Sequence, residues 1–186
     1  GTPKFLIDLI IRNQYNISNL EFLKSSLDLF DSYEPDTLKL IPLLFQTGYI
    51  TLIKKLQENL FLLSYPNYEI KKSFLLHILK YINRNNGISE GSYIIDMLNH
   101  LKANNIESFI EELKVFFSGL PYSLHTQIHN KEQYYHSILY TILALLGIDI
   151  GAEIYTNKGR IDLVMELQRA IYIIEVKIND TIENAL

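Results

Sequence analysis

Three charged residues, Asp162, Glu175 and Lys177, lie in two neighbouring apolar runs and have the chemistry of a cation site. In the first run, residues 159–167, apolar and polar side chains alternate, which predicts a strand with two different faces. The second run, residues 170–178, is apolar except for Glu175 and Lys177, which fall on one face. We therefore expect two strands of one hairpin that present these charges together.

The pairing of the two strands decides whether the two carboxylates meet. A turn centred between Gln168 and Arg169 places Asp162 opposite Glu175. Gln-Arg lacks the Asn-Gly chemistry of the favoured two-residue turns, and an asymmetric lengthening of the loop would shift the pairing. In direct opposition the Cβ atoms lie about 4.5–5.5 Å apart, where the repulsion of two like charges destabilises a sheet. A divalent cation bound between the two carboxylates would offset that repulsion.

The order of these residues, Asp followed by Glu-x-Lys on the next strand, resembles the PD-(D/E)xK nuclease superfamily, although Ile161 stands where the motif has Pro. The resemblance implies that Asp162 and Glu175 hold Mg²⁺ or Mn²⁺, and that Lys177 assists the attacking water in phosphodiester hydrolysis. Mg²⁺ takes oxygen ligands and keeps several waters, so two carboxylates and the backbone carbonyl of Val176 suffice as protein ligands. The expected catalytic residues are Asp162, Glu175 and Lys177.

A wider set of motifs is similar to one bacterial family, which couples an AAA-ATPase-like region to a C-terminal PD-(D/E)xK domain of DUF1703 type. The motifs, in chain order, are GTPKFL, LFQTGYITL, SYPN, YYHSILYTILALLG, GRIDLV and IIEVK, and they span nearly the whole chain. The resemblance implies DNA as a partner and an ATPase region upstream of Gly1. The chain contains no P-loop, so we expect no ATP site in it.

Three further residues are candidates for contact with the substrate or the site. Arg160 shares a strand face with Asp162, and either contacts a substrate phosphate or pairs with Glu175. Glu132 and His136 are four residues apart on one face of an expected helix, where related nucleases often place a Glu. They either complete the site or are a capping Glu and a half-buried His.

Apolar spacing predicts an α+β fold that is mostly helical, and its first two parts are residues 1–65 and residues 66–120. The first part is expected to be winged-helix-like, with a second helix capped by Ser18. The expected elements of that part are helices at residues 3–12, 18–27 and 37–45, followed by a hairpin of residues 49–53 and 60–63. The second part is expected to be a set of helices, including residues 89–102 and 106–117.

The third part, residues 121–186, is expected to be a truncated PD-(D/E)xK core of the restriction-endonuclease-like α/β kind. A helix over residues 130–147 and a strand over residues 152–155 precede the hairpin that carries the motif. Gly159 is expected to serve the intervening turn with a positive φ. A further helix is expected from Ile178, and the chain ends before the remaining core strand and helix, as a C-terminal fragment would.

Composition sets outer bounds on function. The chain has 186 residues, a formal net charge of −4 and no cysteine, which argues against a uniformly basic nucleic-acid binder and fits a reducing cytoplasm. No run reaches the roughly 18 consecutive apolar residues of a membrane-spanning helix, so we expect no membrane partner.

The function favoured by these patterns is metal-dependent hydrolysis of DNA by the full-length protein, and the missing core elements argue against activity of this fragment on its own. One alternative is a catalytically inactive module that binds nucleic acid or protein. The other is a regulatory or assembly fragment of the upstream ATPase. If the motif strand lies at an open sheet edge, it invites pairing with a second copy, so a homodimer is also expected.

Overall fold

The computed structural model describes residues 4–26, 39–83, 90–120, 130–157, 159–167 and 170–178, with the side chains of residues 90–92 left aside. The fold is mixed α+β, as the sequence predicts. The chain divides into two compact units, residues 1–77 and residues 78–186, so the division falls within one helix. The separation into residues 1–65, 66–120 and 121–186 stays a prediction.

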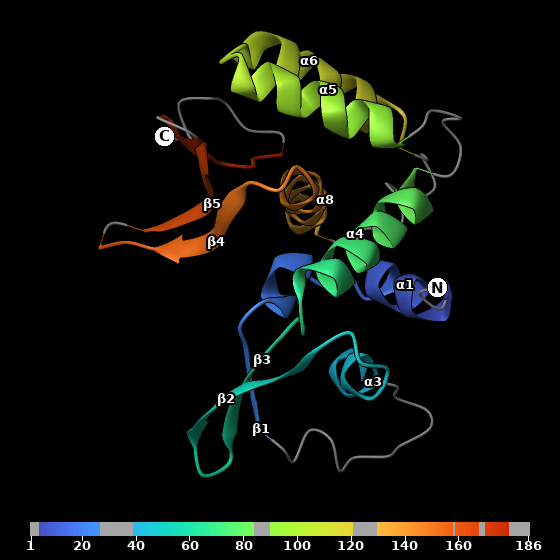
Figure 1. Cartoon of the computed structure of the whole chain (residues 1–186), viewed down its shortest axis with the longest axis vertical. Coiled ribbons are helices and arrows are strands. Elements are labelled where there is room, and N and C mark those ends of the chain that lie inside the picture. Colours follow the sequence, from blue (N-terminus) through green and yellow to red (C-terminus); the bar gives the residue numbers. More distant parts are fainter. Residues whose placement is uncertain are drawn as a thin grey trace. The chain divides into compact units, whose positions relative to one another are not determined.

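The first unit contains a small antiparallel sheet with strand order β1-β3-β2 (Figure 1). Its core consists of apolar side chains that are almost completely buried, among them Leu6, Ile10, Leu20, Leu44, Ile50, Leu63 and Phe74. The elements are α1 (Lys4–Arg12), the 3-10 helix η1 (Ile17–Leu20), β1 (Leu23–Ser26), α3 (Leu40–Gln46), β2 (Thr51–Gln57), β3 (Leu60–Ser64) and most of α4 (Tyr68–Ile82). The winged-helix-like character of this unit stays a prediction.

The helix expected over residues 18–27 is wrong. A single turn, η1, takes its place, and it is capped by Asn16, whose side chain accepts a hydrogen bond from the backbone N–H of Ser18. Phe22 then has a left-handed φ of 60°, and the chain continues as strand β1, which pairs with β3. Pairing with a distant strand overrides the local helical spacing of the leucines.

The other elements of the first unit are confirmed with small shifts of their bounds. Helix α3 contains Pro42 within its first turn, where the missing N–H costs nothing. Gly48, with φ 78°, follows the helix, and the hairpin β2–β3 turns at Glu58 and Asn59, where the polar turn is expected.

The second unit packs helices with a second antiparallel sheet, whose strand order is β4-β5-β6. The elements are the end of α4, α5 (Glu90–Lys102), α6 (Ile106–Ser118), α8 (Lys131–Leu145), β4 (Asp149–Tyr155), β5 (Arg160–Leu167) and β6 (Ala170–Ile174) (Figure 1). The expected helices at residues 89–102, 106–117 and 130–147 are thus confirmed. The helix expected after Ile178 lies outside the described residues.

Helix α8 is the core element of this unit. Every residue from His136 to Leu145 is buried, which is typical of a helix surrounded on all sides by protein. Asn130 caps the helix, because its side chain accepts a hydrogen bond from the backbone N–H of Gln133 at 3.1 Å. The first turns of α8 are therefore held firmly, and they carry Glu132 and His136.

The turn between β4 and β5 is closed by Thr156 and Gly159, whose backbone groups bond at 2.7 Å. Gly159 does not have the positive φ that the sequence suggests, since the positive-φ glycines among the described residues are Gly48 and Gly147. The hydroxyl of Thr156 also accepts a hydrogen bond from the Gly159 N–H, so the side chain of Thr156 stabilises this turn.

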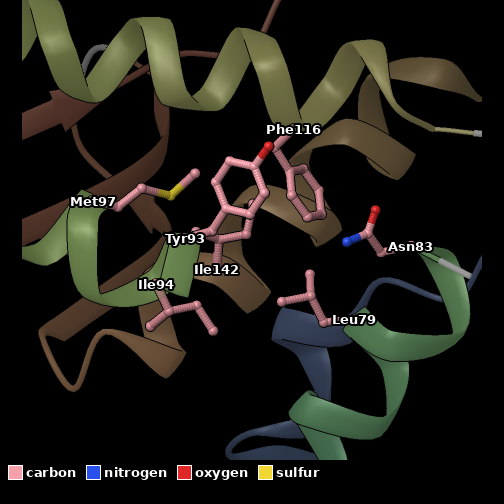
Figure 2. A pocket seen from close by; sticks show the side chains of 7 residues that line it. All are labelled: Leu79, Asn83, Tyr93, Ile94, Met97, Phe116 and Ile142. Atoms are coloured by element: carbon pink, nitrogen blue, oxygen red, sulfur yellow. The ribbon is translucent and has the colours of Figure 1, made fainter. Parts of the chain in front are cut away.

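One small cavity of about 10 Å³ lies within the second unit. Figure 2 shows the seven side chains that line it, which are Leu79, Asn83, Tyr93, Ile94, Met97, Phe116 and Ile142. Its volume suits about one water molecule, so it is too small for a substrate. Among the described residues, no helix combines the length and the apolar character needed to cross a membrane.

Candidate active site

The pairing of β5 with β6 is the one that the sequence predicts. The ladder runs from Leu167 opposite Ala170 to Leu163 opposite Ile174. Glu175 comes directly after the last ladder residue of β6, so the same register brings it opposite Asp162. Asp162 and Glu175 therefore lie next to each other, directly beyond the last paired residues of the β5–β6 ladder.

Asp162 is fixed through both its side chain and its backbone. It is only 5% exposed, and its Oδ2 accepts a hydrogen bond from the backbone N–H of Val176 at 2.9 Å. Its backbone carbonyl lies 3.1 Å from Nε2 of His136 on α8. A buried carboxylate needs such partners, because its desolvation is costly without them.

Glu175 is electrostatically coupled to Asp162. Burial, and then the negative charge of Asp162, raise the pKa of the Glu175 carboxyl above its usual value, while the Lys177 ammonium lowers it in part. The part of the rise that comes from Asp162 is the effect expected of a like charge beside a carboxyl group. A cation placed between the two carboxylates would offset that effect.

Lys177 and Glu132 come together from distant parts of the chain. The Nζ of Lys177 lies 3.5 Å from Oε1 of Glu132, in the first turn of α8. Asn130 provides the helix cap, so Glu132 is not the capping residue that one reading of the sequence suggests. Its carboxylate instead faces the motif lysine.

His136 is buried, at 5% exposure, and is not half-buried as one reading of the sequence suggests. Its Nε2 faces the carbonyl of Asp162, while its Nδ1 has no hydrogen-bond partner among the described residues. Because a carbonyl only accepts, Nε2 is the nitrogen that carries the proton in this contact. The structure therefore places His136 in the protein interior, against the backbone of Asp162.

Arg160 pairs with carboxylates other than the Glu175 that the sequence suggests. Its Nη2 lies 3.7 Å from Oδ1 of Asp162, and its Nη1 lies 3.8 Å from Oε1 of Glu153 on β4. Glu153 was missed by the sequence reasoning. The signal that could have revealed it is its position opposite Asp162 across the β4–β5 turn.

The donor chemistry of the site suits a hard divalent cation. Asp162 and Glu175 offer carboxylate oxygens, which Mg²⁺ prefers, and the N–H of Val176 places that residue's backbone at the same point. No group of three or more His, Cys, Asp or Glu side chains within the described ranges is arranged to hold a metal. The Val176 carbonyl as a third protein ligand stays a prediction.

Comparison with known families matches the C-terminal part of the chain. Residues 130–185 match the PD-(D/E)XK nuclease superfamily. The matched stretch begins at the cap of α8 and includes the described strands β4, β5 and β6, with Glu132, His136, Arg160, Asp162, Glu175 and Lys177.

A longer protein resembles nearly the whole chain. It is a protein of Azotobacter chroococcum mcd 1 described as "Uncharacterized protein in vnfD 5'region", and it is 28% identical over 185 residues. The alignment covers 96% of this chain and 35% of the relative, so the chain spans about a third of that relative's length. No solved structure matches the chain.

Proposed function

We propose that residues 130–178 carry the active site of a divalent-metal-dependent nuclease that hydrolyses phosphodiester bonds in DNA. The observation that supports this most is the meeting of Asp162 and Glu175. Asp162 is held by the Val176 N–H, and its charge raises the pKa of the Glu175 carboxyl. Both lie in the stretch that matches the nuclease superfamily.

In this proposal Asp162, Glu175 and the carbonyl of Val176 hold Mg²⁺ or Mn²⁺. The cation, when bound, supplies positive charge and an activated water at the scissile phosphate. The Val176 N–H keeps Asp162 in the orientation that faces Glu175. His136 contributes from the backbone side, because its Nε2 donates a hydrogen bond to the backbone carbonyl of Asp162 and so restrains the residue that carries the carboxylate.

Lys177 is proposed as the catalytic cation of the chain itself. It would orient the attacking water and offset the negative charge that develops on the phosphate. Its contact with Glu132 restrains an otherwise flexible side chain on the side of the site nearest α8. Arg160, which is 45% exposed, is proposed to contact a substrate phosphate.

The proposal extends to the partners of the longer protein. The motif resemblance supports an AAA-ATPase-like region of the DUF1703-type family upstream of Gly1, and the relative from Azotobacter chroococcum mcd 1 is about three times as long as its aligned part. β6 is the outer strand of the described sheet, and its Ile171 and Ile173 are exposed, which supports a homodimer. A module that binds nucleic acid without cleaving it, or one that serves assembly of the ATPase, is the competing function.

The test is incubation of the full-length protein with linear, circular and branched DNA, in Mg²⁺, in Mn²⁺ and with a chelator. Cleavage that requires the metal supports the nuclease. Binding without cleavage under every condition would replace it with the recognition module. A change in cleavage on addition of ATP would support coupling to the ATPase region.

A further inference from the structure

Glu153 has a backbone conformation that a strand does not require. Its φ is 51°, in the left-handed region that non-glycine residues seldom adopt. The ladder pairs on either side of it, Ala152 with Leu163 and Ile154 with Ile161, are both kept. Glu153 is therefore a local distortion inside a continuous pairing, and it lies opposite Asp162.

The left-handed φ of Glu153 bends strand β4 locally. In a regular strand, residues three apart are separated by about 10 Å. Here a Cβ built on Gly151 would lie only 2.5 Å from Cδ1 of Ile154, so the Ile154 side chain reaches along the strand and lies over Gly151. Strained residues of this kind persist where the surrounding structure holds them, and they cluster at functional sites.

The bend places a third carboxylate beside the candidate metal site. Glu153 lies on β4 between two ladder pairs, Asp162 lies on the neighbouring strand β5, and Glu175 directly follows the end of β6. Between the first two lies the Arg160 guanidinium, 3.8 Å from the Glu153 carboxylate and 3.7 Å from that of Asp162. Arg160 therefore shares its charge between a carboxylate of the site and one outside it.

A divalent cation at Asp162 and Glu175 changes this balance. It repels the nearby guanidinium, so the pairing of Arg160 with Asp162 weakens. The Glu153 carboxylate is then the remaining partner of the two. We propose that Glu153 is a positioning residue that draws Arg160 away from Asp162 when the metal binds and holds its guanidinium toward a substrate phosphate. This inference rests on the proposed metal-dependent function.

The test is a double-mutant cycle on metal affinity, measured by calorimetric titration of the full-length protein with Mn²⁺ and without DNA. R160Q removes the competitor for Asp162 and is expected to tighten Mn²⁺ binding roughly threefold to tenfold, the range for coupled neighbouring charges. E153Q leaves Arg160 with Asp162 alone and is expected to weaken binding by a similar factor. The double variant should bind Mn²⁺ within about twofold of R160Q, because the effect of Glu153 passes through Arg160.

A second variant separates positioning from strain. E153G relieves the left-handed φ, so it should raise the Tm while it weakens Mn²⁺ binding as E153Q does. Duplex DNA binding, measured by fluorescence anisotropy in Ca²⁺, is a second measurement, in which the effect of R160Q on affinity is expected to be opposite to its effect on Mn²⁺ affinity. R160Q should weaken DNA binding several-fold although it binds metal more tightly, since an Arg contact to phosphate is lost.

The outcomes that overturn the inference are specific. E153Q weakening Mn²⁺ binding equally with and without Arg160 would show that Glu153 acts directly on the metal. E153G binding Mn²⁺ like the wild type would show a purely structural residue. R160Q without effect on DNA affinity would remove the phosphate contact. A wild type that binds no Mn²⁺ would overturn the proposed metal site as well, whereas the first three outcomes leave that site intact.

Discussion

The backbone N–H of Val176 donates a hydrogen bond to Oδ2 of Asp162, with 2.9 Å between the two atoms. This bond ties the segment that carries Glu175 and Lys177 to the carboxylate that Glu175 faces. The backbone therefore helps to hold the two acidic groups together. Such an arrangement stores electrostatic repulsion, which metal binding would release.

The repulsion predicts that E175Q stabilises the metal-free protein. The pKa of Glu175 is raised in the folded state, so the folded protein binds the proton more tightly than the unfolded chain does. The free energy of unfolding that this proton contributes is present at low pH and is lost as the pH rises through the folded-state pKa. The Tm of E175Q in chelator should therefore exceed that of the wild type by an amount that grows from pH 4 to pH 8. Mg²⁺ should raise the Tm of the wild type only. A Tm difference that shrinks with rising pH would contradict the coupling of Glu175 to Asp162.

His136 is predicted to support Asp162 rather than to bind substrate. H136F keeps a ring in the buried site but removes the donor to the Asp162 carbonyl, so it should cost about 1–3 kcal/mol in unfolding free energy. Cleavage should fall through kcat with KM little changed. H77F is the matched control, because His77 bonds to a helix carbonyl at an exposed position, and it should change stability by less than about 0.5 kcal/mol. A rise in KM alone would assign His136 to the substrate instead.

Lys177 and Glu132 are predicted to act as a pair. K177M should lower kcat by roughly 10²–10³-fold, the cost of losing a group that stabilises transition-state charge. E132Q should lower it by roughly tenfold, since it only releases Lys177. K131M, a change of an exposed neighbour in the first turn of α8, provides the control and should leave kcat unchanged. If E132Q still reduced kcat in the K177M background, Glu132 would have a role of its own.

The two glycines that border turns are predicted to differ in their tolerance of a side chain. A Cβ would meet no atom within 4 Å at either Gly48 or Gly159, but Gly48 alone of the pair has a left-handed φ. G48A should therefore lower the unfolding free energy by about 1–2 kcal/mol, and G159A should be nearly neutral. Denaturant unfolding of the two variants measures the difference. Equal losses would show that the conformation after α3 is not as described.

The register of the motif hairpin could be predicted because it depends on local information. Alternation fixes the faces of β5 and β6, and a symmetric turn fixes which residues oppose each other, so the meeting of Asp162 and Glu175 follows from the sequence. The sequence offers Glu132 as a residue that could complete the site, but it does not predict the contact of Glu132 with Lys177, because that contact depends on how α8 lies against the strand end.

Two features escaped the sequence for physical reasons. The role of Glu153 depends on a left-handed residue inside a strand, and nothing in the spacing of its neighbours signals that conformation. Strand β1 escaped because its pairing with β3 joins residues about forty apart, while the local leucine spacing favours a helix. For β1, a long-range contact outweighs the local preference.

The most direct test of the account is Mg²⁺-dependent DNA cleavage by the full-length wild type, by D162N and by E166Q. Glu166 is an exposed carboxylate on the same strand as Asp162, so E166Q controls for the loss of one charge from β5. The account predicts that D162N loses activity by at least about 10³-fold, because several kcal/mol of transition-state stabilisation depend on the metal that Asp162 holds. E166Q should cleave like the wild type. Equal cleavage by the wild type and D162N would contradict the assignment of Asp162, and with it the proposed site.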